Sequence, residues 1–190
     1  MLGNLTNLEQ LDLGGNNISD ISVLGNLTNL QTLNLSGNSI SDISALKNLT
    51  KLTKLSWGYN GVGIITDRDA SVLRDLTSLQ ELDLSGNNIS DISALKSLTN
   101  LKQLGLGANE ISDISALENI TNLQTLNLRD NEISDISALG NLTNLESLRL
   151  DYNNISDISA LGNLSGLSWL DLSNNCLLYT SDAADDRISV

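Results

Sequence analysis

The chain is 190 residues long and carries 23 acidic against 10 basic residues, a formal charge of −13 at pH 7. Such a charge repels phosphate backbones and anionic lipid surfaces, which argues against nucleic-acid binding and direct membrane insertion. The chain has no histidine and one cysteine, and it lacks both a G-x-S-x-G motif and a phosphate-binding glycine loop followed by a helix. We therefore predict no enzymatic activity, no cofactor and no metal site.

A 22-residue unit repeats along almost the whole chain, mostly with the pattern L-x-x-L-x-L-x-x-N-x-I. This pattern is the signature of a leucine-rich repeat solenoid. We therefore predict an α/β solenoid domain of about eight coils over residues 1–175. The third copy, residues 48–74, has 27 residues, and the copies begin at Asn4, Asn26, Asn48, Asp75, Ser97, Asn119, Asn141 and Asn163.

Each copy predicts a short strand followed by a turn onto the opposite side of the coil. In the first copy, Leu11 and Leu13 alternate with polar residues, which is the period of a β-strand. Ordering one coil costs at least as much free energy as burying its leucines provides, so neighbouring coils must stabilise one another. We expect a curved right-handed coil with a concave parallel β-sheet of about eight short strands. Convex 3-10 or short-helix segments should form the other side.

An asparagine follows every predicted strand. Its side-chain amide can bond backbone groups that a turn leaves unpaired, so we predict a structural role for it, on its own coil and on the next. This asparagine column consists of Asn16, Asn38, Asn60, Asn87, Asn109, Asn131, Asn153 and Asn175.

An aspartate recurs in the phrase S-D-I-S, just before the convex segment. An aspartate at that place can cap the free amides of a one-turn helix. A ladder of stacked carboxylates could instead hold a metal, but the spacing of a calcium-binding loop is absent. The aspartate column consists of Asp20, Asp42, Asp91, Asp113, Asp135 and Asp157.

The third copy differs from its neighbours through a five-residue insertion within residues 61–74. Trp57 replaces an inward leucine there, so we expect it to fill or distort the core. Thr66 and Asp69 resemble a capping box, which predicts a longer convex helix in this coil. The insertion is either neutral variation or a contact with a partner.

Large and charged side chains on the predicted concave face are concentrated in copies six to eight. Binding hot spots are usually arginine or aromatic residues, so we place a protein-binding site there. Alternatively, Tyr152 and Trp169 are neutral surface variation. The candidates are Arg129, Asp130, Arg149, Asp151, Tyr152, Trp169 and Asp171, with Lys54 and Tyr59 as a second group in copy three.

The two ends of the chain depart from the repeat. Residues 176–190 have no counterpart earlier in the chain, and their first ten, CLLYTSDAAD, match one reading frame of a transposase-end sequencing adapter. We expect this tail to be non-native, or alternatively an irregular cap, so Cys176 carries no information on redox chemistry. The chain also begins within a repeat, and we expect it to be a fragment. Open leucine rows at its ends predict end-to-end self-association.

The combined phrase N-L-T-N-L-x-x-L-x-L-x-x-N-x-I-S-D-I-S-A-L, repeated over residues 4–175, resembles the repeats of the bacterial internalin family. The resemblance implies a secreted or cell-surface protein whose concave sheet binds a protein ligand. The helical cap, immunoglobulin-like domain and wall anchor of that family have no counterpart in this sequence. Similar repeats occur in intracellular phosphatase regulators, so an intracellular regulatory scaffold and a passive spacer remain alternatives.

Overall fold

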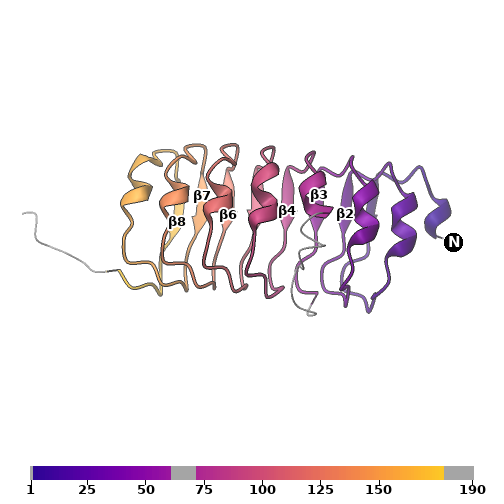
Figure 1. Ribbon diagram of the computed structural model, residues 1–190, viewed down its shortest axis with the longest axis horizontal. Coiled ribbons are helices and arrows are strands. Elements are labelled where there is room, and N and C mark those ends of the chain that lie inside the picture. The colour runs from indigo at the N-terminus through magenta and orange to yellow at the C-terminus, as the bar shows by residue number, and fades with distance from the viewer. Residues whose placement is uncertain (1, 61–71, 178–190) are drawn as a thin grey trace, which may run out of the picture.

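The computed structural model describes residues 2–60 and 72–177. Within these residues the chain forms one elongated stack of coils, with the strands along one side and the helical segments along the other (Figure 1). The predicted capping box at Thr66 and Asp69 lies outside the described residues, and so does the tail beyond Leu177.

In the described part of the chain, eight three-residue strands form one parallel sheet in chain order. Each strand pairs in register with the next, so residues at the same repeat position lie side by side, as Leu104 and Leu126 do. The strands are β1 (Gln10–Asp12), β2 (Thr32–Asn34), β3 (Lys54–Ser56), β4 (Glu81–Asp83), β5 (Gln103–Gly105), β6 (Thr125–Asn127), β7 (Ser147–Arg149) and β8 (Trp169–Asp171). The predicted concave sheet is confirmed.

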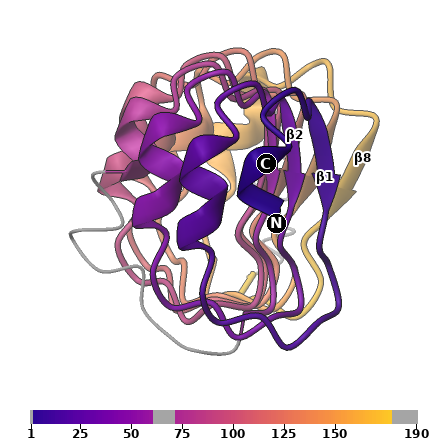
Figure 2. The same ribbon diagram turned by 90° about the vertical axis from the view of Figure 1, so that its right-hand side faces the viewer.

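The convex side consists mainly of 3-10 segments, as predicted. Seen along the solenoid axis, these segments and the sheet form opposite walls of each coil (Figure 2). Residues 72–75, at the junction of the third and fourth copies, are α-helical instead. The predicted greater length of this helix is not tested, because residues 61–71 lie outside the described residues. The 3-10 segments are η1 (Leu2–Asn4), η2 (Ser22–Asn26), η3 (Ser44–Asn48), η4 (Ser93–Ser97), η5 (Ser115–Leu117), η6 (Ser137–Leu139) and η7 (Ser159–Asn163).

Aliphatic side chains fill the space between the two walls. In the interior coils, the central strand leucines Leu104, Leu126 and Leu148 are at most 1% exposed. Trp57 is buried with them, as expected, although its Nε1 has no hydrogen-bond partner among the described residues. In the outermost described coils, Leu5 and Leu170 are 52% and 41% exposed. These apolar side chains support the predicted end-to-end self-association, which stays a prediction.

The asparagine column fastens each coil to the coil before it. Asn153 Nδ2 donates to the carbonyl oxygen of Leu150 in its own coil and to that of Leu128 in the preceding coil, at 3.1 and 2.9 Å. Its Oδ1 accepts the backbone N–H of Ile133, also in the preceding coil, at 3.0 Å. These bonds fit the structural role predicted for the column, but the side chain contacts the preceding coil, and the prediction of the next coil was wrong. Within the described part of the chain, the Asn16 side chain accordingly donates only to carbonyl oxygens of its own coil.

The aspartates of S-D-I-S bind the start of the convex segment through a short local bond. Asp135 Oδ1 accepts the backbone N–H of Ser137 at 2.8 Å. Because η6 begins at Ser137 and Ile136 is its N-cap residue, the aspartate lies one residue before the cap and forms an Asx turn. The same bond is made by Asp20, Asp42, Asp91, Asp113 and Asp157.

These turns predict acid sensitivity. Hydrogen bonds from the Ser137 amide and hydroxyl hold the pKa of Asp135 below its usual value of 3.8, and Asp113 and Asp157 behave alike. A carboxyl group whose pKa is lower in the folded state stabilises the fold above the unfolded pKa, and this stabilisation is lost as the pH falls through the folded pKa. Replacing all three by asparagine keeps the acceptors, so the decline of Tm between about pH 5 and pH 2 should become shallower than in the wild type. Identical slopes in calorimetry would contradict this.

Candidate functional site

The concave face is formed by three positions of each repeat: the first and third strand residues, and the residue two places after the strand. In five coils the third strand residue is aspartate or asparagine, and its side chain accepts the backbone N–H two residues on. This second turn-forming column, which sequence reasoning missed, consists of Asp12, Asn34, Asp83, Asn127 and Asp171. Bonds from the Ser173 hydroxyl and amide, and the charges of Arg149 and Arg129, lower the pKa of Asp171.

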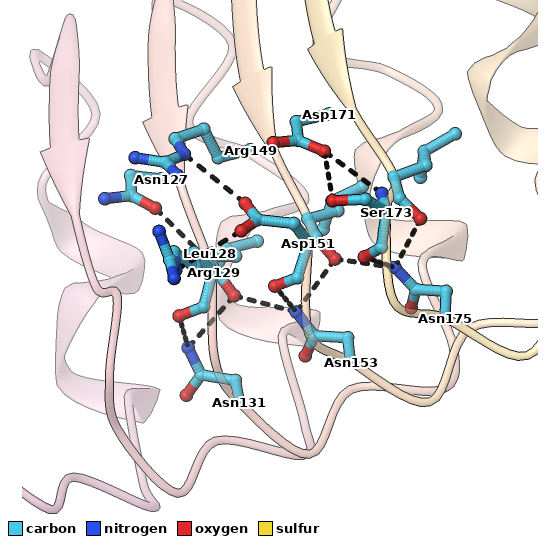
Figure 3. A network of polar contacts seen from close by, with 12 residues as sticks. Asn127, Leu128, Arg129, Asn131, Arg149, Asp151, Asn153, Asp171, Ser173 and Asn175 are labelled. Atoms are coloured by element: carbon cyan, nitrogen blue, oxygen red, sulfur yellow. Dashed lines mark hydrogen bonds and ion pairs between the residues drawn. The ribbon is translucent and has the colours of Figure 1, made fainter.

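A buried carboxylate joins two arginines in coils six and seven (Figure 3). The Asp151 side chain is 3% exposed, and its two oxygens lie 3.2 Å from Arg129 Nε and 3.3 Å from Arg149 Nε. Burying a carboxylate is unfavourable unless it is paired, and here two cations compensate one anion. Asp151 therefore fixes the positions of both guanidinium groups.

Each of these arginines also lies over an aromatic ring. The guanidinium carbon of Arg129 is 5.1 Å from the centre of the Tyr152 ring, and that of Arg149 is 5.7 Å from the Trp169 ring. Both separations are within the range of cation–π attraction. Tyr152 and Trp169 remain 48% and 46% exposed. We call these five residues, Arg129, Arg149, Asp151, Tyr152 and Trp169, the arginine–aromatic patch.

Of the remaining candidates from the sequence, Asp130 lies beside this patch, whereas Lys54 and Tyr59 lie in coil three. Asp130 lies beside Tyr152 of the next coil, because the Asp130 backbone N–H donates to the carbonyl oxygen of Asp151, the residue before Tyr152. Lys54 forms an ion pair with Glu81 on the neighbouring strand. Tyr59 is 64% exposed, and its ring lies over Gly86 of the following coil. The structure thus brings the candidates of coils six to eight together, while Lys54 and Tyr59 stay with coils three and four.

Both exposed tyrosines sit on a left-handed backbone, which sequence reasoning missed. Tyr59 and Tyr152 have φ values of 56° and 57° at a position that is glycine in coils one, two and four, where φ is 67° to 70°. A non-glycine residue in this conformation costs on the order of 1 kcal/mol or more. Ala108, Asp130 and Asn174 adopt the same conformation at this position, with φ of 53° to 56°, so the left-handed backbone belongs to the repeat turn in general.

A hollow of about 310 Å³ lies beside the patch on the concave face. It spans β3 to β6, and its lining includes Gly105, the one third-position residue in these strands without a side chain. Its polar wall consists of Lys54, Ser56, Glu81, Asp83, Ser85, Gln103, Thr125 and Asn127. Sequence reasoning missed this feature.

The described residues show neither of two other kinds of site. In residues 2–60 and 72–177, no group of three or more histidine, cysteine, aspartate or glutamate side chains could hold a metal ion. In the same part of the chain, no helix has the length and hydrophobicity needed to cross a membrane.

Known proteins resemble this chain over most of its length. The sequence model for leucine-rich repeats (two copies) matches residues 6–48, 28–67, 77–119 and 121–165. An internalin (inlF) from Listeria monocytogenes shares 42% identity at a TM-score of 0.86, covering 92% of this chain and 50% of that one. Internalin C2 (inlC2) from the same organism shares 35% identity at a TM-score of 0.88, covering 96% and 79%.

A more distant structural match is a complex of TLR13 with ssRNA13, at 30% identity and a TM-score of 0.77, covering 95% of this chain and 27% of that one. No curated protein sequence matches. This chain thus spans half of the inlF chain and about four fifths of internalin C2. With the repeat match and these identities, the chain belongs to the leucine-rich repeat family and, within it, to the internalins.

Proposed function

We propose that the arginine–aromatic patch binds a protein ligand on the concave face of coils six to eight. The observation that carries this proposal is the buried Asp151, which holds Arg129 and Arg149 in place at 3.2 and 3.3 Å. Side chains that are already fixed lose less conformational entropy when a partner binds. Arginine, tyrosine and tryptophan are also the residues that most often dominate binding energy.

The repeat itself favours this proposal over a passive spacer. Leucine-rich repeat domains are protein-interaction modules, and the fold is a non-enzymatic scaffold. The patch residues replace the small residues of other coils, since Ser36 and Asn34 occupy the repeat positions of Arg129 and Arg149. A spacer does not need these substitutions.

The nature and location of the partner follow from charge and similarity. The TLR13 complex contains an RNA, but the formal charge of −13 on this chain opposes a phosphate backbone. We therefore favour a protein ligand over a nucleic acid. Similarity to the internalins favours a secreted or cell-surface protein over an intracellular scaffold.

A consensus-reverted variant tests the proposal. It combines Arg129→Ser, Arg149→Asn, Asp151→Ser, Tyr152→Gly and Trp169→Thr, and each new residue occurs at the same repeat position in another coil. The variant should therefore fold. Peptides selected on the wild type from a phage library of random sequences should mostly lose affinity for the variant, by at least about tenfold, because the hot-spot side chains are gone.

The matched control places two reversions on the convex side, Lys96→Gly and Glu118→Gly, where both residues are exposed. This control should retain the affinity of the wild type for the selected peptides. If most peptides bind the patch variant as tightly as they bind the wild type, the patch is not the binding site.

A further inference from the structure

The concave hollow exists because Gly105 breaks a side-chain column. In β1, β2, β4, β6, β7 and β8 the third strand residue carries a long or polar side chain, whereas Gly105 in β5 carries none. A Cβ atom added to Gly105 would come within 2.6 Å of Asp83 Oδ1. The carboxylate of Asp83 therefore leans over Gly105 and forms one wall of the hollow.

The first two coils show how the equivalent aspartate, Asp12, is bonded when the neighbouring strand has a side chain at the third position. Asp12 Oδ1 accepts two hydrogen bonds there, from the Gly14 backbone at 2.8 Å and from Asn34 Nδ2 in the next coil at 2.9 Å. Asp83 Oδ1 accepts the matching backbone bond from Ser85 at 3.0 Å. Because Gly105 has no amide to offer, Asp83 receives no cross-coil donor among the described residues.

The charges around the hollow leave Asp83 as its uncompensated group. The one cation that lines the hollow, Lys54, forms an ion pair with Glu81. The chain as a whole carries a formal charge of −13, so its field attracts positively charged partners over distances longer than a contact. The Asp83 carboxylate and the net negative charge of the chain therefore both favour a positively charged ligand.

We propose that the hollow between β3 and β6 receives a cationic side chain, a lysine or an arginine, from a basic segment of the protein partner. The ammonium or guanidinium group binds Asp83, in the place that the Asn34 amide takes on Asp12. The hollow and the arginine–aromatic patch then contact the same partner at two neighbouring places on the concave sheet. This inference rests on the proposed function in that it takes the concave face to be the protein-binding surface.

The test is a titration of the ¹⁵N-labelled chain with acetyl-Gly-Lys-Gly-amide, followed by NMR. The peptide should shift the backbone amides of Gly105, Ser85 and Asn127 in a saturable way, with affinity on the order of millimolar for a single side chain. The matched peptide with norleucine in place of lysine keeps the aliphatic stem but has no charge. It should leave these amides unchanged.

Two variants separate the charge from the shape of the hollow. Asp83→Asn keeps the acceptor for Ser85, as Asn34 does for Ser36 at 3.0 Å, and should weaken binding by about five- to tenfold through loss of the charge. Gly105→Asn fills the hollow and supplies the missing amide, so it should abolish the shifts. Asp12→Asn, at the same repeat position in coil one, is the matched control and should bind as the wild type does.

The outcomes distinguish this inference from the proposed function. The consensus-reverted patch variant keeps Asp83 and Gly105, so it should still bind the lysine peptide even if it loses the selected peptides. Shifts that are equal for norleucine, or unchanged in Asp83→Asn, would overturn the inference. So would shifts spread over the amides of the convex aspartate column, because they would show general attraction to acidic groups.

Discussion

Replacing Asn153 by alanine is expected to lower the free energy of unfolding by about 3–5 kcal/mol. The Asn153 side chain is 6% exposed and bonds two carbonyl oxygens and one N–H group of two coils within 3.1 Å. Alanine would leave the buried N–H of Ile133 without its acceptor, at a cost of roughly 1–3 kcal/mol. It would also remove one of two donors from the carbonyl oxygens of Leu128 and Leu150, which keep their bonds from Asn131 and Asn175, and each lost hydrogen bond costs about 0.5–1.5 kcal/mol. Urea unfolding followed by circular dichroism measures the change.

Asn16 provides the matched control, because it has the same repeat position but lies in the first coil. It is exposed and bonds two carbonyl oxygens of its own coil. Asn16→Ala should therefore lower the free energy of unfolding by less than about 1 kcal/mol. Similar losses for the two variants would show that the bonds between coils contribute little.

Leu126→Ala is expected to cost about 2–5 kcal/mol, the range for a leucine deleted from a packed interior. Leu126 is 1% exposed and lies in register with Leu104 on one side and Leu148 on the other. The neighbouring coils are fixed by their own asparagine bonds, so they can close the resulting cavity only in part. Thermal and urea unfolding of the purified variant measure the loss.

Leu11→Ala tests whether this cost comes from the neighbouring coils. Leu11 occupies the same repeat position, is partly buried, and has a strand neighbour on one side, Leu33. We expect a loss of about 1–2 kcal/mol, because less apolar surface is buried there. If Leu11→Ala costs as much as Leu126→Ala, stability does not depend on contacts between neighbouring coils in the way that solenoids require.

Much of the fold followed from the sequence because the same side chains recur at the same places. The alternation of Leu11 and Leu13 predicted the strands, and the asparagine column predicted a structural amide. The direction of its bonds did not follow, because a column that is identical in every coil does not show whether Asn153 contacts the coil before it or after it. Asn29, Asn100, Asn122 and Asn144, whose amides donate to a threonine carbonyl of the preceding coil, were missed altogether.

The candidate site was predictable as a list of neighbours but not as an arrangement. Counting along the repeat placed Arg129, Arg149 and Trp169 near one another, because in-register strands align equal positions. The burial of Asp151 between two guanidinium groups depends on side-chain rotamers, which spacing does not determine. The left-handed backbone at Tyr152 was missed, although glycine at the same position in coils one, two and four is the sequence signal for it. The hollow at Gly105 arises from a missing side chain, and it became visible through its neighbour Asp83.

The direction of the asparagine bonds has a consequence for how the chain is made. A ribosome releases the N-terminal coils first, and the acceptor for the Ile133 amide, Asn153, emerges 20 residues later. Each coil is therefore completed by the next one to leave the exit tunnel. Folding can therefore proceed from the N-terminus one coil at a time during translation. Each newly synthesised coil brings the asparagine that bonds the coil before it.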